Sequence, residues 1–232
     1  MSFSSAIIDA LREFPELKLI DAQKLHQEKL EDIPETTFYK TLSRLTENDK
    51  LVRLTKGIYC KPKKGRFGKI VSSEKNLLEY YLGESKDKGV IVGYRLFNNR
   101  GLTTQVSKTV KLYSNNVVQQ EKNIKNLTIL KAELRFNSTT KKMVELLEVL
   151  QEHKKIEDLN LNKFMSFIED AVKYYDEKTI ARVLKTFSYK KSTIASLGKT
   201  LDFFKVEHGL KKYLSGTSKY DELRIEELYE ST

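Results

Sequence analysis

Residues 21–62 read DAQKLHQEKLEDIPETTFYKTLSRLTENDKLVRLTKGIYCKP, and this stretch decides the fold of the amino-terminal part of the chain. It begins with a short helical segment that Asp21 is suited to cap, and a turn containing Pro34 leads into a second, amphipathic helix. Two short apolar segments follow, joined at Lys56-Gly57, where glycine permits the positive φ that tight hairpins commonly need. This order of elements predicts a winged helix-turn-helix.

The second helix of this stretch has two chemically different faces. Phe38, Leu42 and Leu45 recur at helical spacing and predict a buried stripe. Thr36 and Thr37 are residue types that cap helix starts. The remaining surface offers side chains that can bond base edges and phosphates, so we predict a DNA-binding set of Thr36, Thr37, Tyr39, Lys40, Ser43 and Arg44. In a winged helix-turn-helix this helix lies in the DNA major groove.

Basic residues continue through the hairpin and beyond it. We expect phosphate contacts from Arg53 and Lys56, with the basic path extended by Lys61, Lys63, Lys64 and Arg66. Residues 35–70 contain ten Lys or Arg and three acids, so this segment carries +7 while the whole chain carries +10. The charge is therefore concentrated where the fold prediction places a DNA surface. The alternative is a solvated basic face on a module that docks a protein without DNA.

Length and composition set the outline of the whole chain. At 232 residues, with 39% hydrophobic and 32% charged residues, it has room for two domains. We predict an α+β, mainly helical fold with an N-terminal winged helix-turn-helix over residues 1–68 and a second domain over 69–232. The stretch KPKKGRFGKI, with one Pro, two Gly and five Lys or Arg, is typical of a linker.

The second domain is expected to contain two parts. Residues 71–137 predict a small α/β region, with a helix capped by Ser73, a short buried strand or helix entry at GVIVG, and strands at TVKLYS and NLTILKAEL. Residues 138–232 show helical periodicity in four segments, which start at KKMVELLEVL, LNKFMSFIED, EKTIARVLKT and STIASLGKTL. The acidic tail DELRIEELYE predicts a solvated helix or a frayed end, and the alternative is an acidic contact to a basic partner.

The chain resembles the AbiEi antitoxin family of the type IV toxin–antitoxin systems of abortive infection, a form of phage defence. The resemblance rests on the amino-terminal module ending in RLTKGIYCKP and, most distinctively, on GYRLFNNRGLTTQVSKTV. The matching positions of that segment are Gly93, Tyr94, Asn98 or Asn99, Gly101, Leu102, Thr104 and Gln105. Ser107 stands where a proline is common. The match covers residues 1–135, and the C-terminal helices match weakly.

Membership of that family would imply two roles. The amino-terminal domain would bind repeats in its own promoter and repress the operon. The remainder would neutralise a co-encoded nucleotidyltransferase-like toxin, without needing to form a stable complex with it. For a partner surface, the segment offers a polar set of Tyr94, Arg95, Asn98, Asn99, Arg100 and Gln105. The simpler interpretation is that Gly101 makes a turn, Leu102 packs, and the threonines and Gln105 satisfy local backbone groups.

Catalytic and metal-binding patterns are not found in the sequence. His26, His153 and His208 lie far apart without neighbouring ligand patterns, and there is no phosphate-cradling loop or nucleophile elbow. Glu84-Ser85-Lys86 has the Glu-x-Lys spacing of some nucleases, but no strand with an upstream Asp accompanies it. We interpret this tripeptide as an exposed charge pair. We expect no enzymatic activity, no cofactor and no metal.

The sequence also predicts the cellular location. No apolar run approaches the ~20 residues that span a bilayer, so no membrane contact is expected. MSFSSAIIDALREF lacks the basic start and apolar core of a signal peptide. Cys60 is the single cysteine, which excludes an internal disulfide and fits a reducing cytoplasm; we expect it to be a small core residue.

Overall fold

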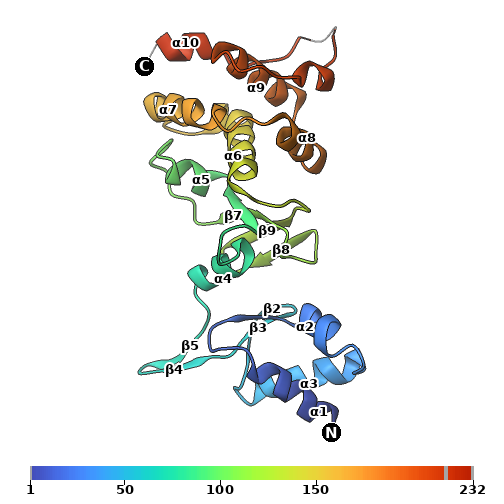
Figure 1. Cartoon of the computed structure of the whole chain (residues 1–232). Coiled ribbons are helices and arrows are strands. Elements are labelled where there is room, and N and C mark those ends of the chain that lie inside the picture. Colours follow the sequence, from blue (N-terminus) through green and yellow to red (C-terminus); the bar gives the residue numbers. More distant parts are fainter. Residues whose placement is uncertain (1, 217–218, 231–232) are drawn as a thin grey trace. The chain divides into compact units, whose positions relative to one another are not determined.

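The computed structural model describes residues 2–216 and 219–230. It is a mixed α+β structure in which helix, at about 48%, outweighs strand, at about 15%. The chain forms two compact units (Figure 1). Unit 1 comprises Met1–Tyr80 with Asn123–Lys125, and unit 2 comprises Tyr81–Lys122 with Asn126–Thr232.

Unit 1 begins with three helices and a three-stranded sheet. In chain order these elements are α1 (Phe3–Arg12), β1 (Leu19–Asp21), α2 (Ala22–Lys29), α3 (Glu35–Glu47), β2 (Val52–Thr55) and β3 (Ile58–Cys60). The sheet has the order β1-β3-β2 and both pairings are antiparallel. Tyr59 in the central strand lies opposite Ile20 on one side and Arg53 on the other.

Several local predictions are confirmed in unit 1. The Asp21 carboxylate accepts bonds from the backbone amides of Gln23 and Lys24, at 3.1 and 3.2 Å, and so caps α2. The hairpin between β2 and β3 turns at Lys56-Gly57, where Gly57 has φ 75°. Cys60 is buried in β3.

The core of unit 1 explains why these elements pack together. The stripe of Phe38, Leu42 and Leu45 on α3 is buried, as predicted. It packs with apolar side chains from the other elements of the unit, including Ile7, Leu11, Ile20, Ala22, Leu25, Ile33, Leu51 and Tyr59. Burial of this stripe fixes which face of α3 remains for solvent.

The start of α3 differs from the prediction. Pro34 is the residue before the helix and Glu35 is its first residue, and no side chain caps this end. Thr36 and Thr37 lie inside the first turn, where their own hydroxyls do not close the helix start. The Thr37 carbonyl instead accepts a bond from the Thr41 hydroxyl at 2.9 Å. Strand β1 was also not predicted, because three residues are too short to show a period.

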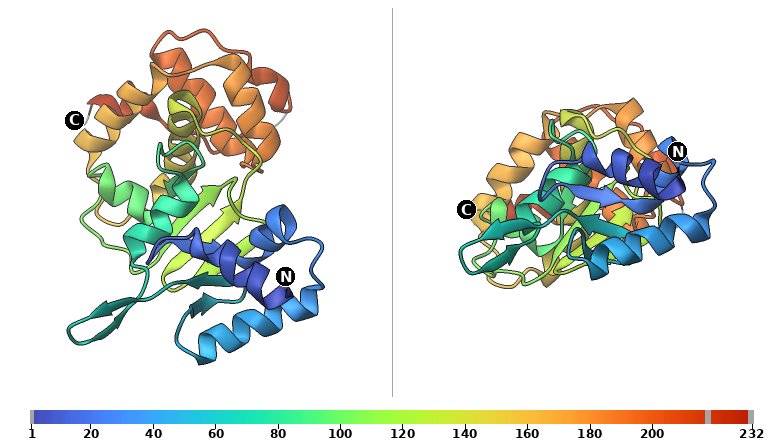
Figure 2. Two further views of the ribbon diagram at one scale, coloured as in Figure 1. Left: turned by 60° about the horizontal axis from the view of Figure 1, so that its bottom comes forward. Right: turned by 90° about the horizontal axis from the view of Figure 1, so that it is seen from below.

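The predicted linker contains a second hairpin, so that prediction is wrong for most of its length. Strands β4 (Lys63–Gly65) and β5 (Gly68–Ile70) pair in antiparallel register, with Gly65 opposite Gly68. Figures 1 and 2 show this hairpin extending away from the three helices of unit 1. The Pro, Gly and Lys content of this segment fits an exposed hairpin as well as a linker, so composition alone does not distinguish the two.

A helix, α4 (Glu74–Leu82), follows, and the boundary between the units falls in its last turn. The predicted cap is confirmed, because the Ser73 hydroxyl accepts a bond from the Asn76 amide at 3.3 Å. Leu77 and Tyr81 are buried, and Leu78 is partly buried.

Unit 2 contains a four-stranded sheet with the order β6-β7-β9-β8. Its elements are β6 (Gly89–Val92), α5 (Tyr94–Asn99), β7 (Val110–Ser114), β8 (Glu121–Ile124) and β9 (Leu127–Lys131). The predicted strands at GVIVG, TVKLYS and NLTILKAEL are confirmed, whereas α5 and β8 were not predicted. Strands β7 and β9 are parallel, with Leu112 opposite Ile129.

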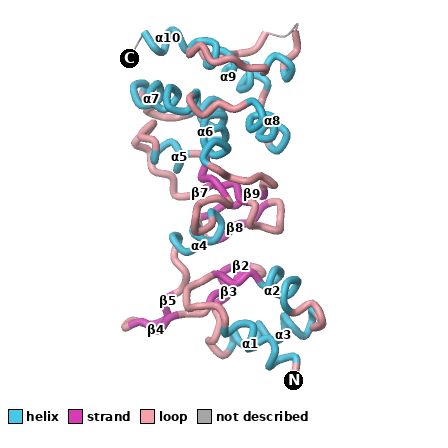
Figure 3. The backbone as a smooth tube through the Cα atoms, viewed as in Figure 1, coloured by secondary structure: helices cyan, strands magenta, loops and turns pink. Residues whose placement is uncertain are grey.

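After β9 the chain of unit 2 is helical, and Figure 3 shows these helices in cyan and the strands in magenta. They are α6 (Ser138–Glu152), α7 (Leu161–Val172), α8 (Glu177–Thr186), α9 (Lys191–Phe203) and α10 (Ile225–Glu230), with 3-10 turns η1 (His153–Lys155) and η2 (Leu210–Tyr213). The four predicted helical segments correspond to α6–α9. Helix α6 is buried continuously from Met143 to Leu150, so it is the centre of this core.

The acidic tail contains a helix whose acidic side chains Glu226, Glu227 and Glu230 are exposed, as predicted, but two of its apolar residues are packed in the core. Ile225 is fully buried and Leu223 is nearly so, and both belong to the core of unit 2. The Leu223 amide donates to the Ser196 hydroxyl on α9 at 2.9 Å. The packing of Leu223 and Ile225 was not predicted, because two apolar residues in an acidic segment are too few for a periodic signal.

Candidate nucleic-acid interface

The face of α3 opposite its buried stripe carries the predicted polar residues. Thr36, Lys40, Ser43 and Arg44 are exposed, and Thr37 and Tyr39 are partly buried. Phe38, Leu42 and Leu45 anchor the other face of α3 in the core. The polar side chains therefore project from a helix that is held in place by packing.

Arg44 and Ser43 already make bonds within the chain. An Arg44 Nη2 donates to the Ser4 hydroxyl of α1 at 3.2 Å, and the Ser43 hydroxyl lies 3.3 Å from the Glu47 carboxylate. A guanidinium has five N–H donors, so one bond to Ser4 leaves Arg44 able to bind a phosphate or a base edge. The Ser4 contact positions Arg44 beside the amino-terminal end of α1.

Tyr39 occupies the edge between the core and the polar face. Its ring packs edge-to-face against Phe38, with centroids 5.2 Å apart. Burial, followed by the nearby Glu35 carboxylate, raises the pKa of the Tyr39 hydroxyl above its usual range. At neutral pH this hydroxyl is therefore a protonated donor, which suits contact with a phosphate oxygen or a base acceptor.

The β2–β3 hairpin presents two of its three predicted cations to solvent. Arg53 and Lys56 are exposed, the first on β2 and the second at the turn. Lys61 is different, because its ammonium donates to the Phe14 carbonyl at 2.7 Å and to the Arg12 carbonyl at 3.3 Å. Burial and the neighbouring Arg12 lower the pKa of Lys61. Lys61 thus satisfies carbonyls at the end of α1 rather than extending the outer basic path.

The β4–β5 hairpin supplies the rest of the basic path. Lys63, Lys64 and Arg66 are exposed, as is Phe67 at the turn. Lys69 on β5 forms an ion pair with Asp49, the residue that follows α3 by two positions. This pair connects the hairpin to the end of the helix that carries the polar face.

The net result is a basic surface over residues 35–70 of unit 1. Of the ten Lys or Arg residues in 35–70, nine are exposed and Lys61 alone is partly buried. Two of the three acids in this range are engaged locally, Glu47 with Ser43 and Asp49 with Lys69. Clustered cations of this density attract polyanions and raise the rate of encounter with them.

Sequence reasoning missed the exposed aromatic of this surface. Phe67 is 96% exposed, and the Arg66 guanidinium lies 5.6 Å from the centre of its ring. The motif that could have revealed it is Gly-Arg-Phe-Gly, in which two glycines bracket two residues in the manner of a hairpin turn. Because residues 61–70 were interpreted as a linker, this hairpin turn was not predicted.

The polar segment of unit 2 is largely engaged inside its own unit. The Tyr94 hydroxyl donates to the Lys155 carbonyl at 2.9 Å, the Asn98 amide donates to the Thr103 carbonyl at 3.3 Å, and the Gln105 amide lies 3.3 Å from the Asp158 carboxylate. Arg95 is partly buried and Asn99 is exposed. The bonds of Tyr94 and Gln105 connect the segment to the chain before α7, and the bond of Asn98 lies within the segment.

Arg100 belongs to the same pattern. Its guanidinium pairs with the Glu145 carboxylate of α6 at 2.5 Å and lies 5.8 Å from the Phe167 ring centre. Gly101 has φ 69°, Leu102 is fully buried, and the Thr103 hydroxyl donates to the Glu157 carbonyl at 2.7 Å. The expected turn at Gly101 and the packing of Leu102 are confirmed, whereas the Gln105 side chain contacts the Asp158 carboxylate instead of a local backbone group. A partner-binding role for the polar set stays a prediction.

A cavity of about 380 Å³ in unit 2 is lined by α5, β7 and α6. Glu148 lies in its wall and is 5% exposed, and its Oε1 accepts bonds from the hydroxyls of Tyr113 and Tyr189 at 3.2 and 3.1 Å. Burial raises the pKa of Glu148 despite the opposing effects of Lys111 and the two tyrosines. Both tyrosine pKa values are raised as well. The carboxyl is thus a satisfied interior acceptor.

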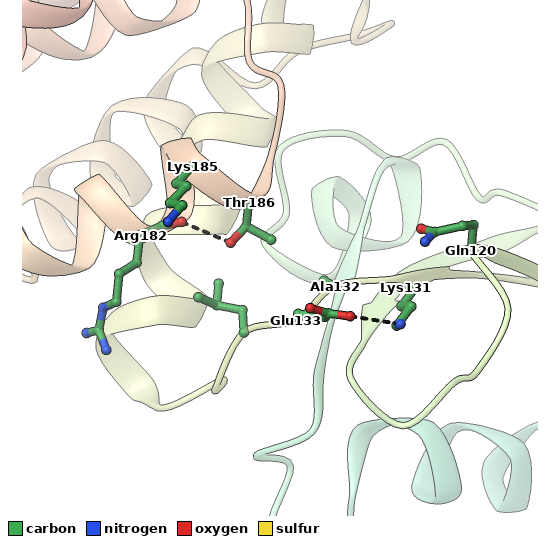
Figure 4. Close-up of a pocket in the computed structure, with 8 residues that line it drawn as sticks. Gln120, Lys131, Ala132, Glu133, Arg182, Lys185 and Thr186 are labelled. Carbon is green, nitrogen blue, oxygen red and sulfur yellow. Dashed lines mark hydrogen bonds and ion pairs between the residues drawn. The ribbon is translucent and has the colours of Figure 1, made fainter. Parts of the chain in front are cut away.

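A second hollow, of about 550 Å³, lies between β9 and α8 (Figure 4). Its basic side chains are Lys131, Arg182 and Lys185, and Lys131 is paired with Glu133 at 2.8 Å. The Thr186 hydroxyl at its edge donates to the Arg182 carbonyl at 3.0 Å. The Lys131–Glu133 pair therefore lies within one wall of the hollow, and the Thr186–Arg182 bond lies within α8.

Metal-binding groups and membrane-spanning helices are both absent from residues 2–216 and 219–230. Within them, no group of three or more His, Cys, Asp or Glu side chains is arranged to hold a metal ion. No helix in the same ranges has the length and apolar character needed to cross a membrane. His26, His153 and His208 instead contact their own surroundings. The first lies 2.7 Å from the Ile33 carbonyl, the second 2.7 Å from the Leu150 carbonyl and the third 3.2 Å from the Asp202 carboxylate.

These observations define a mixed α+β protein with a basic surface on its amino-terminal unit. The chain belongs to the Family of unknown function (DUF6088), whose profile matches residues 25–194. No curated protein matches it. Among solved structures, the chain is similar to one described as the crystal structure of the RV2827C protein from Mycobacterium tuberculosis, with 11% sequence identity and a TM-score of 0.42. That alignment covers 86% of this chain and 76% of the other.

Proposed function

We propose that unit 1 is a winged helix-turn-helix and that the chain uses it to bind double-stranded DNA as a transcriptional repressor. The support for this fold is the order α1-β1-α2-α3-β2-β3 together with the sheet order β1-β3-β2. In such a module the last helix is the reader and the hairpin after it is the wing. Here those elements are α3 and the β2–β3 hairpin.

One observation carries the DNA-binding proposal. Nine cations of residues 35–70 are exposed on the unit that also presents the polar face of α3. Positive charge supplies most of the sequence-independent affinity for DNA, and side chains on a groove-bound helix supply the sequence discrimination. Unit 1 combines both features.

The proposed binding mode assigns different tasks to the two elements. Helix α3 lies in the major groove, where Arg44 and Lys40 reach base edges or flanking phosphates. Arg53 and Lys56 on the wing contact the phosphate backbone, as do Lys63, Lys64 and Arg66 on the second hairpin. Lys61 takes no part in DNA contact, because it bonds to the carbonyls at the end of α1.

The biological role we propose is that of an antitoxin of a type IV system that represses its own operon. Its support is the sequence resemblance to AbiEi antitoxins over residues 1–135. The partners would be promoter repeats and a co-encoded nucleotidyltransferase-like toxin, with or without a stable complex. The proposed activity is binding in the cytoplasm and involves no catalysis.

The DNA-binding proposal is tested by gel-shift titration of the purified chain on the DNA upstream of its own gene. A scrambled duplex is the competitor, and the titration is repeated at two salt concentrations. We expect a specific complex that weakens as salt rises. Arg44→Ala should lower the affinity for the specific site by about 1–3 kcal/mol and relax its sequence preference. A chain that binds neither duplex at low salt would instead be a protein-docking module.

The antitoxin proposal requires a separate experiment. The chain is co-expressed with the product of the neighbouring gene, and growth is compared with expression of that product alone. Restored growth supports the proposal. Growth arrest that persists although both proteins accumulate would contradict it, whatever the result with DNA.

A further inference from the structure

The β4–β5 hairpin has a shape and chemistry that the winged-helix assignment does not use. Its register pairs Lys63 with Ile70, Lys64 with Lys69 and Gly65 with Gly68, which leaves Arg66 and Phe67 as a two-residue turn. Gly68 has φ 122°, a conformation that side chains rarely adopt. The sequence therefore builds a sharp tip at these two residues.

Phe67 is the most exposed large apolar side chain among the described residues, at 96%. A lone exposed apolar residue needs no special explanation, but three features set this one apart. It lies at the tip of an arm, it is bracketed by glycines, and the Arg66 guanidinium lies 5.6 Å from its ring centre. The tip thus presents an aromatic face and a cation together.

The charge of the arm indicates the kind of partner. Residues 61–73 contain five Lys or Arg and no acid. Lys63, Lys64 and Arg66 are exposed along the arm, and Lys69 is tied to Asp49 just beyond α3. This ion pair holds the arm on the same unit as the proposed reading helix. A polyanion that binds to α3 could therefore also contact the β4–β5 hairpin.

We propose that the β4–β5 hairpin is a DNA-bending arm whose Phe67 wedges between base pairs from the minor groove. Apolar wedges of this kind partly unstack a base step and bend the duplex, which brings more phosphates against the protein. In this arrangement, Lys63, Lys64 and Arg66 hold the backbone on either side of the wedge. The inference rests on the proposed DNA binding by unit 1 and adds a deformation that α3 and the wing do not produce.

The test is a gel-shift series in which the upstream DNA is placed at different positions within fragments of equal length. For a bending protein, the mobility of the complex depends on where the site lies. We expect the wild-type chain to show this dependence. Phe67→Ala should lose most of it and bind about tenfold more weakly. Its salt dependence should stay unchanged, because every cation remains.

Two matched variants separate the wedge from a general effect on the hairpin. Phe67→Leu keeps an apolar wedge and should retain bending. Ile70→Ala removes the other exposed apolar side chain of the same hairpin, 47% exposed at its base, and should bend DNA as the wild type does. Equal loss of bending in Phe67→Ala and Ile70→Ala would overturn the inference.

The remaining outcomes distinguish this inference from the proposed function. Specific binding without bending by the wild type would overturn the arm's role and leave the repressor proposal intact. Absence of any DNA binding would overturn both. Vesicles containing anionic lipid are tested in parallel. Binding to them that depends on Phe67, with DNA bending unaffected by Phe67→Ala, would overturn the inference in favour of a membrane surface.

Discussion

Unit 1 keeps its charges at the surface, whereas unit 2 brings several into its interior. In unit 1, Asp21 is the one charged side chain among the described residues that is buried, and it caps α2. In unit 2, Lys122, Glu145 and Glu148 are all buried. Glu145 holds Arg100, and Glu148 holds two tyrosine hydroxyls.

This difference bears on which residues can act on a partner. A charge already paired in the interior is committed to its partner, and removing that partner leaves an uncompensated buried group. An exposed cation contributes little to stability, so it remains available to a ligand. We therefore propose that the exposed cations of residues 35–70 act in recognition, whereas Arg100 of the polar segment in unit 2 is already paired with Glu145.

The largest expected effect comes from the core of unit 1. Phe38→Ala removes a fully buried ring from α3 and should lower the free energy of unfolding of unit 1 by about 3–5 kcal/mol. Lys40→Ala, on the opposite face of the same helix, should change it by less than about 0.5 kcal/mol. Amide hydrogen exchange resolves unit 1 from unit 2. Similar losses for the two variants would remove the distinction between the two faces of α3.

The next effect tests the buried charges of unit 2. Glu148→Ala leaves the hydroxyls of Tyr113 and Tyr189 without their acceptor, so we expect a loss of about 1–3 kcal/mol in unfolding free energy. Glu148→Gln keeps an acceptor oxygen and should lose less. Urea titration followed by circular dichroism measures both. If the alanine variant is as stable as the wild type, Glu148 does not have the architectural role assigned to it.

A smaller effect is expected on the surface of unit 1. Lys56→Ala should weaken binding to every duplex similarly and make the slope of log affinity against log salt shallower by about 1. Its folding stability should not change, because Lys56 is exposed. Lys211→Ala, an exposed lysine of unit 2, is the control and should leave the slope as in the wild type. Fluorescence anisotropy measures the slopes, and identical slopes for Lys56→Ala and wild type would argue against the wing contact.

The smallest effect is a dependence of stability on pH. Glu177 on α8 accepts bonds from Lys212, from the Tyr175 hydroxyl and from the Gly209 amide, which together lower the pKa of its carboxyl to about 2. A lowered pKa means that the stabilisation is present above the ordinary carboxyl range. It is lost as pH falls from there toward 2.

We therefore expect Glu177→Gln to unfold with a flatter acid profile than the wild type. Because the side chain is partly exposed, solvent screening keeps the effect small. Glu207→Gln, an exposed acid of the same unit, should follow the wild-type profile. Thermal unfolding at stepped pH provides the comparison. Parallel profiles for Glu177→Gln and wild type would show that the three bonds do not act on stability.

Periodic segments were predictable from the sequence, and contacts that depend on distant residues were not. The stripe on α3 and the helices α6–α9 follow from apolar spacing, which is a local property. Strand β1 is defined by its pairing with β3, some forty residues later, so no local pattern reveals it. Likewise, the parallel pairing of β7 with β9 arises only in three dimensions.

In the candidate site too, local features were predicted and contacts with distant residues were not. Lys40 and Arg44 were predicted on the face of α3 opposite its buried stripe and are exposed there, because amphipathic spacing determines the face. Their contact with DNA stays a prediction. Lys61 was assigned to the same DNA-binding set, yet its ammonium bonds to carbonyls 47 and 49 residues earlier in the chain. Phe67 was overlooked, since an aromatic residue is ordinarily expected in the core.

The most direct test of the assignment of recognition to unit 1 is amide hydrogen exchange of the full chain with and without its upstream DNA at low salt. The account predicts slower exchange in α3, the β2–β3 hairpin and the β4–β5 hairpin, with helices α6–α9 unchanged. Protection confined to unit 2, or a bound complex in which residues 35–70 exchange as in the free chain, would contradict it.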